Sequence, residues 1–207
     1  MKLPPPLFFI KMKRVFLIHG WEGYPDNCWF PWLKAELKEK GFEVIIPAMP
    51  SPDNPKIGEW VNFLKEQVVK PDENTYFIGH SMGCRTILQY LQDLPEKSKV
   101  GGVIFVAGWI SLTPMATRTE QEKQIAKPWL EKPHDYKKMK AHCDKFVAIF
   151  SDNDLYVPIK ENSDTYKEKL NAKIIVEKGK GHFGDDDNVK ELPIVLKELL
   201  KMVKAEK

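Results

Sequence analysis

Ser81 stands at the centre of the segment Gly79-His80-Ser81-Met82-Gly83, between an apolar run and a segment with helical spacing. A glycine on each side of a serine permits a sharp turn from strand to helix, because neighbouring backbone can pass without Cβ clashes. Such a turn would expose the hydroxyl above the sheet as a nucleophile. The alternative is that Ser81 only caps the following helix, a position that serine favours. Capping alone does not require two flanking glycines, so we favour the nucleophile.

A serine hydroxyl is a weak nucleophile at neutral pH and needs a base that an acid holds in place. In chains with this turn, the acid and then the histidine follow the serine on loops after later strands. His182 comes after the last expected strand, whereas the other four histidines lie earlier in the chain. The segment after the preceding strand, SDNDLYVP, offers Asp152 and Asp154. We favour Asp154, which stands further into the loop, and keep Asp152 as the alternative.

The charge that develops on an attacked carbonyl oxygen needs backbone N–H donors. One donor is expected from Met82, the residue after the serine. The second should come from the loop after the first strand, where Trp21 is preferred and Glu22 or Gly23 is the alternative. Trp21 and Trp109 each follow the carboxyl end of an expected strand, where ligands bind in open α/β sheets. We therefore expect both tryptophans to line an aromatic, apolar pocket that disfavours charged substrates.

Strands and helices alternate along the chain from residue 14, as apolar runs and helical spacing indicate. The expected strands are 14–20, 42–47, 75–79, 100–108, 145–151 and 172–178, and the expected helices are 28–41, 57–69, 81–94, 159–170 and 189–203. Pro193 should lie in the first turn of the last helix or kink it. Apolar strands separated by helices predict an α/β fold with a mostly parallel sheet covered on both faces. A length of 207 residues suits one domain.

Residues 109–142 interrupt this rhythm, because they are longer than one crossover helix requires and contain three prolines. A long excursion at the carboxyl edge of a sheet often forms a lid or a binding loop. The other interpretation is a crossover helix with ordinary additions. The sequence leaves both open.

The composition is that of an ordinary globular protein, with 43% hydrophobic and 29% charged residues and a net charge of +3. Arginine occurs only at positions 14, 85 and 118, which argues against nucleic-acid binding. No apolar run reaches the roughly 18 residues of a membrane helix. Three cysteines without a pairing pattern indicate reduced thiols, so we expect a cytoplasmic protein without a membrane partner.

Two other features could suggest chemistry, and we discount both. The acidic run GDDDN at 184–188 could bind a cation, but acids at the start of the last helix fit its dipole and its cap better. Cys84 lies about one helical turn after Ser81, so we expect it to be buried and to point away from the site. We therefore expect no metal and no cofactor.

The expected α/β domain spans residues 14–207, and the start of the chain lies outside it. Residues 1–13 form an expected N-terminal extension, and translation from Met12 instead of Met1 would begin directly at the first strand. Both starts are kept as hypotheses.

Four segments, FLIHGW, GHSMG, SDNDLYVP and GKGHFG, occur in this order and together resemble the α/β-hydrolase superfamily. The segment NCWFPWLKAELKEKGFEVIIPAMPSPDNP, followed by IGEWVNFL, is similar to small serine hydrolases of the retinoblastoma-binding-protein type and their bacterial relatives. The resemblance extends from Arg14 to the final helix. Residues 1–11 have no family counterpart, and the L-x-C-x-E pattern of retinoblastoma binding is absent, so that binding is not carried over.

The resemblance implies a three-layer α/β/α sandwich, a reduced α/β-hydrolase fold without the superfamily's first strands. It also implies a triad of Ser81, Asp154 and His182 with esterase-like activity. We therefore expect a serine hydrolase that cleaves a small ester or thioester through an acyl-enzyme. The alternatives are an amide or peptide hydrolase with the same triad, and a binding protein of this fold with little turnover. The natural substrate and the oligomeric state stay open.

Overall fold

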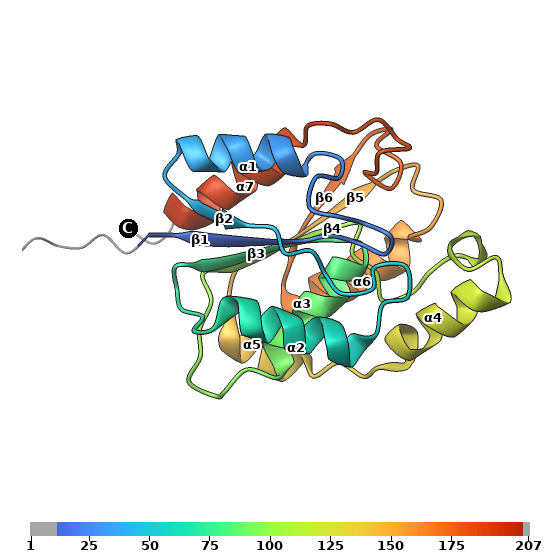
Figure 1. Ribbon diagram of the computed structural model, residues 1–207, viewed down its shortest axis with the longest axis horizontal. Coiled ribbons are helices and arrows are strands. Elements are labelled where there is room, and N and C mark those ends of the chain that lie inside the picture. Colours follow the sequence, from blue (N-terminus) through green and yellow to red (C-terminus); the bar gives the residue numbers. More distant parts are fainter. Residues whose placement is uncertain (1–11, 205–207) are drawn as a thin grey trace, which may run out of the picture.

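A single six-stranded sheet, in which every neighbouring pair of strands is parallel, forms the centre of the molecule (Figure 1). The computed structural model describes residues 12–204. The strand order is β2-β1-β3-β4-β5-β6. The strands are β1 (Arg14–Ile18), β2 (Glu43–Ile45), β3 (Thr75–His80), β4 (Gly102–Val106), β5 (Phe146–Ser151) and β6 (Lys173–Glu177).

Helices cover both faces of this sheet, as its apolar strands require. The helices are α1 (Phe30–Glu39), α2 (Ile57–Val68), α3 (Met82–Gln92), α4 (Glu120–Glu131), α5 (Tyr136–His142), α6 (Ile159–Leu170) and α7 (Pro193–Lys204), with a 3₁₀ turn, η1, at Pro114–Ala116. Figure 1 shows α1 and α7 on one face, with α2, α3 and α5 on the other. The expected three-layer α/β/α architecture is confirmed.

Alternate residues of β1 supply the two cores. Phe16 and Ile18 pack with α2 and α3, whereas Val15 and Leu17 pack with α1 and α7. This alternation follows from the two-residue period of a strand. Every residue of β3, β4 and β5 is buried, which explains why these segments are continuous apolar runs in the sequence. The central strands therefore form a fixed base whose carboxyl ends meet at one edge.

Each expected strand and helix overlaps an observed element, and β4 and α1 are each four residues shorter than the expected 100–108 and 28–41. The edge strand β2 spans only three residues, fewer than the expected 42–47. The last helix begins at Pro193 rather than at residue 189. A proline fits the first helical position, since its missing N–H would have no helical partner there. The first-turn expectation for Pro193 is therefore correct, and its alternative, a kink, is wrong.

Residues 109–142 contain both a crossover helix and an excursion. Helix α5 packs against α3 and α6 below the sheet, as a crossover helix does. Helix α4 and η1 instead lie beyond the carboxyl edge of the strands, at the right of Figure 1. Thr119 and Glu122 form a capping box that starts α4. Trp129 anchors α4, because its indole N–H donates to the Pro55 carbonyl 2.9 Å away.

The expected extension and the choice between Met1 and Met12 depend on residues 1–11, which lie outside the described residues. Within residues 12–204, no helix is long and apolar enough to cross a membrane.

Candidate active site

Ser81 lies in a strained turn between the last residue of β3 and the first residue of α3. Its φ of 51° and ψ of −116° are unfavourable for any residue with a Cβ. Although Ser81 occupies the N-cap position, its side chain makes no capping hydrogen bond. The capping alternative is therefore wrong, and the hydroxyl points elsewhere.

The two flanking glycines are explained by close packing of the backbone. A Cβ on Gly79 would lie 2.7 Å from the Cys84 nitrogen, and a Cβ on Gly83 would overlap the Ile18 carbonyl oxygen at the end of β1. Glycine thus lets α3 start directly against β1 and β3. This close approach fixes Ser81 above the carboxyl ends of the central strands.

Replacing Gly83 with alanine is expected to lower the free energy of unfolding by about 3 kcal/mol, because the new methyl group meets fixed backbone. Urea denaturation measures this change. The matched control is Gly58→Ala in the first turn of α2, where a Cβ would meet nothing within 4 Å. The control should raise stability by about 0.5–1 kcal/mol. Equal effects of the two substitutions would contradict the packing argument.

The structure brings Ser81, His182 and Asp154 into one hydrogen-bonded series. The Ser81 hydroxyl lies 2.9 Å from His182 Nε2, and His182 Nδ1 lies 2.8 Å from Asp154 Oδ2. The Asp154 side chain is only 2% exposed, and its Oδ1 accepts the N–H groups of Tyr156 and Val157. In this arrangement, Nδ1–H donates to the carboxylate, and Nε2 is free to accept the serine proton.

Asp152 does not reach His182. Its Oδ1 accepts the backbone N–H of Gly179 at 2.7 Å, so it joins two loops as a turn residue. Geometry therefore separates the two acids that the sequence left open, and it places Asp154 in contact with His182.

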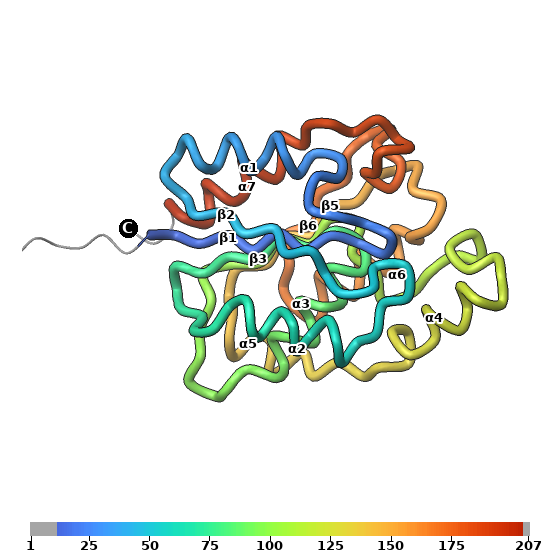
Figure 2. Tube along the Cα trace, viewed as in Figure 1, coloured from blue at the N-terminus to red at the C-terminus, as the bar shows by residue number. Residues whose placement is uncertain are grey.

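The acidic run 184–188 stabilises the loop of His182. Asp187 accepts the N–H groups of His182 and Gly184, and Asp185 pairs with Asn27, with the Cys28 N–H and with Lys190. Figure 2 shows the corresponding loops of the blue and red parts of the chain next to each other. The expectation that these acids cap the last helix is wrong, because that helix begins only at Pro193. Within residues 12–204, no group of three potential ligands could hold a metal ion.

Two of the three candidate oxyanion donors in the first loop are already engaged. The Glu22 N–H donates to the Pro52 carbonyl at 2.7 Å, and the Gly23 N–H donates to the Gly20 carbonyl at 3.1 Å. Within residues 12–204, the N–H groups of Trp21 and Met82 form no hydrogen bond with a backbone acceptor. These two groups therefore remain available for an oxyanion.

His19 holds this first loop in place, a role that the sequence analysis missed. The ring is buried, its Nδ1–H donates to the Gly20 carbonyl at 2.8 Å, and its Nε2 accepts the Met49 N–H at 3.0 Å. Burial lowers the pKa of His19, which keeps it in this neutral form. Its position directly after β1 and next to Gly20 was the one feature of the sequence that could have indicated this role.

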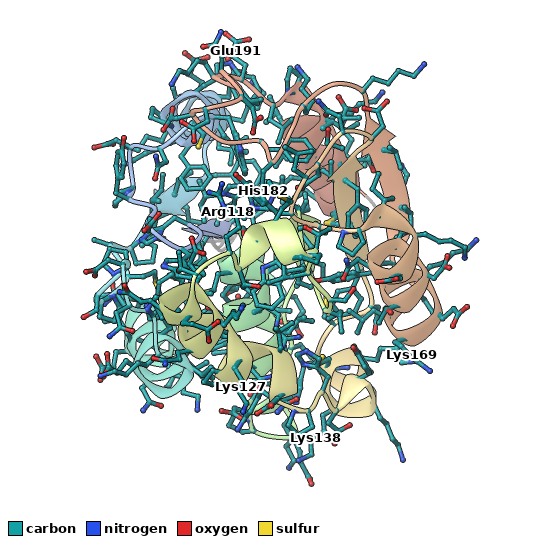
Figure 3. All side chains as sticks on the ribbon, turned by 90° about the vertical axis from the view of Figure 1, so that its right-hand side faces the viewer. Arg118, Lys127, Lys138, Lys169, His182 and Glu191 are labelled. Carbon is teal, nitrogen blue, oxygen red and sulfur yellow. The ribbon has the colours of Figure 1, made fainter. Side chains whose placement is uncertain are left out.

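A cavity of about 390 Å³ opens beside Ser81 and His182, and we call it the Ser81 cavity. Trp21 and Trp109 both line it, as expected, and η1 and α4 add apolar side chains, namely those of Met115, Ala116 and Ala126. Charged side chains line it too, those of Glu22, Arg118, Glu122 and Asp186. The pocket is therefore aromatic as expected, but its charged side chains depart from the expected apolar character. Figure 3 shows Arg118 and His182 on the same face of the molecule.

The three cysteines cannot replace Ser81 as nucleophile. All three are buried, and Cys84 donates its thiol to the Val106 carbonyl, below the turn and away from the cavity. Burial raises the pKa of Cys28 and of Cys143 to about 12, and it raises the pKa of Cys84 as well. The expectation for Cys84 agrees with this placement.

Comparison with known proteins identifies the family. The family model described as serine hydrolase matches residues 15–201. YdeN of Bacillus subtilis is 32% identical over 183 residues, which cover 88% of this chain and 92% of that protein. The serine hydrolase RBBP9 of Rattus norvegicus is 27% identical over 188 residues, 90% of each chain.

A solved structure agrees with these matches. The crystal structure of the ydeN gene product from B. subtilis superposes with a TM-score of 0.85 at 30% identity, covering 93% of this chain and all of that one. The resemblance to small serine hydrolases of the retinoblastoma-binding-protein type and their bacterial relatives is thus confirmed. The chain belongs to the serine hydrolase family, with an α/β-hydrolase fold.

Proposed function

We propose that this protein hydrolyses a small carboxylic ester or thioester through an acyl-enzyme on Ser81. The observation that carries this proposal is the hydrogen-bonded series from Ser81 through His182 to Asp154, which ends at an open cavity. Membership of the serine hydrolase family supports it.

In the first half of the proposed reaction, His182 Nε2 takes the hydroxyl proton while Ser81 Oγ attacks the carbonyl carbon. Asp154 stabilises the imidazolium that forms. The N–H groups of Met82 and Trp21 donate to the oxyanion of the tetrahedral intermediate. The intermediate collapses to the acyl-enzyme, and the leaving alcohol or thiol receives the proton from His182. A water molecule, activated by the same imidazole, then releases the acid and restores Ser81.

The cavities beside Ser81 support a small substrate with two distinct ends. The Ser81 cavity lies under η1 and α4, which contribute the apolar side chains of Met115 and Ala126, and we assign the acyl group to it. A second cavity of about 650 Å³ meets it at Ser81 and His182 and is lined by both polar and apolar side chains, among them those of Tyr24, Asn27 and Leu155. We assign the leaving group to this second cavity, and we assign the α4 segment, residues 112–131, the role of a lid over the first.

A fluorophosphonate probe tests the proposal, because it phosphonylates a serine only when a neighbouring base activates it. We expect one adduct per chain, which tryptic digestion and mass spectrometry would locate on Ser81. Preincubation with a short-chain nitrophenyl ester should slow the labelling. A folded protein that stays unlabelled, or an adduct on another residue, would overturn the proposed function.

A further inference from the structure

The loop that carries His182 has little regular structure of its own, so its position depends on bonds to its neighbours. Three of its backbone N–H groups donate to side chains at the end of β5 and in the loop after it: Gly179 to Asp152, Lys180 to Ser151 and Gly181 to Asn153, at 2.7–2.9 Å. That loop also carries Asp154. These bonds therefore fix His182 relative to Asp154, but they do not fix it relative to Ser81, which lies in the turn after β3.

His80 provides the missing connection. It is the last residue of β3, directly before Ser81, and its Nε2 lies 2.7 Å from the His182 carbonyl oxygen. A carbonyl oxygen only accepts, so His80 Nε2 carries the proton and donates it. Within residues 12–204, this is the one hydrogen bond besides the Ser81–His182 contact itself that joins the His182 loop to the turn of Ser81.

The surroundings hold the His80 ring in one orientation and keep it neutral. The residue is 8% exposed, and the rings of Trp29 and Phe30 make T-shaped contacts with its ring, with centroids 6.3 and 6.2 Å away. The rings of His80 and His182 lie 5.2 Å apart. Burial is the main cause that lowers the pKa of His80 to about 3, and the charge of the neighbouring His182 lowers it further. A neutral His80 does not repel the positive charge that His182 carries during the proposed reaction.

We propose that His80 is a positioning residue, whose Nε2–H holds the His182 backbone carbonyl and thereby sets the His182 imidazole against the Ser81 hydroxyl. This inference rests on the proposed function of Ser81 and His182. Its physical basis is that proton transfer depends steeply on geometry, since a displacement of about 1 Å can cost about 100-fold in rate.

The test is His80→Leu, which removes the donor and fills the buried site with an apolar side chain. For a nitrophenyl ester, we expect kcat to fall about 10- to 100-fold while KM changes less than about threefold. The rate of fluorophosphonate labelling should fall by the same factor as kcat, because labelling also needs His182 in place.

Two conservative variants distinguish a positioning role of the His80 N–H from a role of the side chain in packing alone. The amide nitrogen of Gln can occupy the place of Nε2 and donate to the same carbonyl, so His80→Gln should recover most of the lost kcat. The amide nitrogen of Asn corresponds to Nδ1, which faces Gly20, so His80→Asn should not recover it. This pair still decides the question if His80→Leu fails to fold.

The matched control is His142→Leu at the end of α5. His142 is also buried, and its Nδ1 lies 2.8 Å from the Ser98 carbonyl oxygen, but it does not line either cavity beside Ser81. The His142→Leu variant should lower the midpoint of thermal unfolding without changing the kcat of the folded enzyme.

The outcomes are distinguishable. If wild type neither labels nor hydrolyses esters, the proposed function fails, and the positioning role fails with it. If wild type is active and His80→Leu keeps its kcat and labelling rate, only the positioning role is overturned. Equal losses of kcat in His80→Leu and His142→Leu, or in His80→Gln and His80→Asn, would also overturn it.

Discussion

Replacing Ser81 with alanine is expected to lower kcat for a nitrophenyl ester by about 10⁶-fold, as removal of the nucleophile does in serine hydrolases with this chemistry. The substitution removes only Oγ, and that atom makes no capping bond with α3. The free energy of unfolding should therefore change by less than about 1 kcal/mol. Initial rates and urea denaturation, measured on the same preparation, check both expectations.

The matched control for this prediction is Ser163→Ala on α6. Its hydroxyl donates to the Lys160 carbonyl on an exposed surface, so its loss should leave kcat unchanged. A Ser81→Ala variant that keeps more than about one hundredth of the wild-type rate would contradict the assignment of the nucleophile, because backbone donors and binding alone give far less.

Replacing Asp154 with asparagine is expected to lower kcat by about 10⁴-fold, the size of the corresponding change in chymotrypsin-type enzymes. The geometry explains why the substitution should be so damaging here. Oδ1 of Asp154 accepts two backbone N–H groups, so the oxygen of an asparagine would stay there and its NH₂ group would face His182. Nδ1 of His182 would then have to accept, its proton would move to Nε2, and the imidazole could no longer accept the Ser81 proton.

Asp152→Asn is the matched control for the acid, because it makes the same chemical change two residues away. Its side-chain oxygen can still accept the Gly179 N–H, so kcat should change less than about threefold. The pH dependence of kcat for all three proteins would show whether the loss persists at every pH, as a wrong tautomer requires. If Asp152→Asn were the crippled variant, the assignment of Asp154 as the acid would be wrong.

Several parts of the molecule could be predicted because they depend on short stretches of sequence. Apolar runs identified the strands that are buried on both faces, and the bounds of α6 agree with the expected range 159–170. The paired glycines around Ser81 predicted a tight strand-to-helix turn, since only glycine permits such close backbone contact. The order of serine, acid and histidine also placed all three side chains at one edge of the sheet, because carboxyl ends of parallel strands meet there.

The start of the last helix and the role of the acidic run before it could not be predicted from short stretches of sequence. Residues 189–192 continue the apolar pattern of α7, but the chain becomes helical only at Pro193. The preceding carboxylates bind N–H groups of their own loop and of the distant Cys28. The local sequence pattern favoured a helix capped by these acids. Contacts with remote parts of the chain instead determined where the acids bind and where the helix begins.

The sequence by itself thus determined the fold class, the strained turn of Ser81 and the candidate base His182, because periodicity and backbone sterics act over a few residues. Only the tertiary structure decided that Asp154 rather than Asp152 contacts His182, and that the Trp21 N–H is free while those of Glu22 and Gly23 are engaged. The bond from His80 to His182 also emerged only there. The physical reason is that hydrogen bonds select single atoms at about 3 Å, and residues 102 positions apart reach that distance only when the chain is folded.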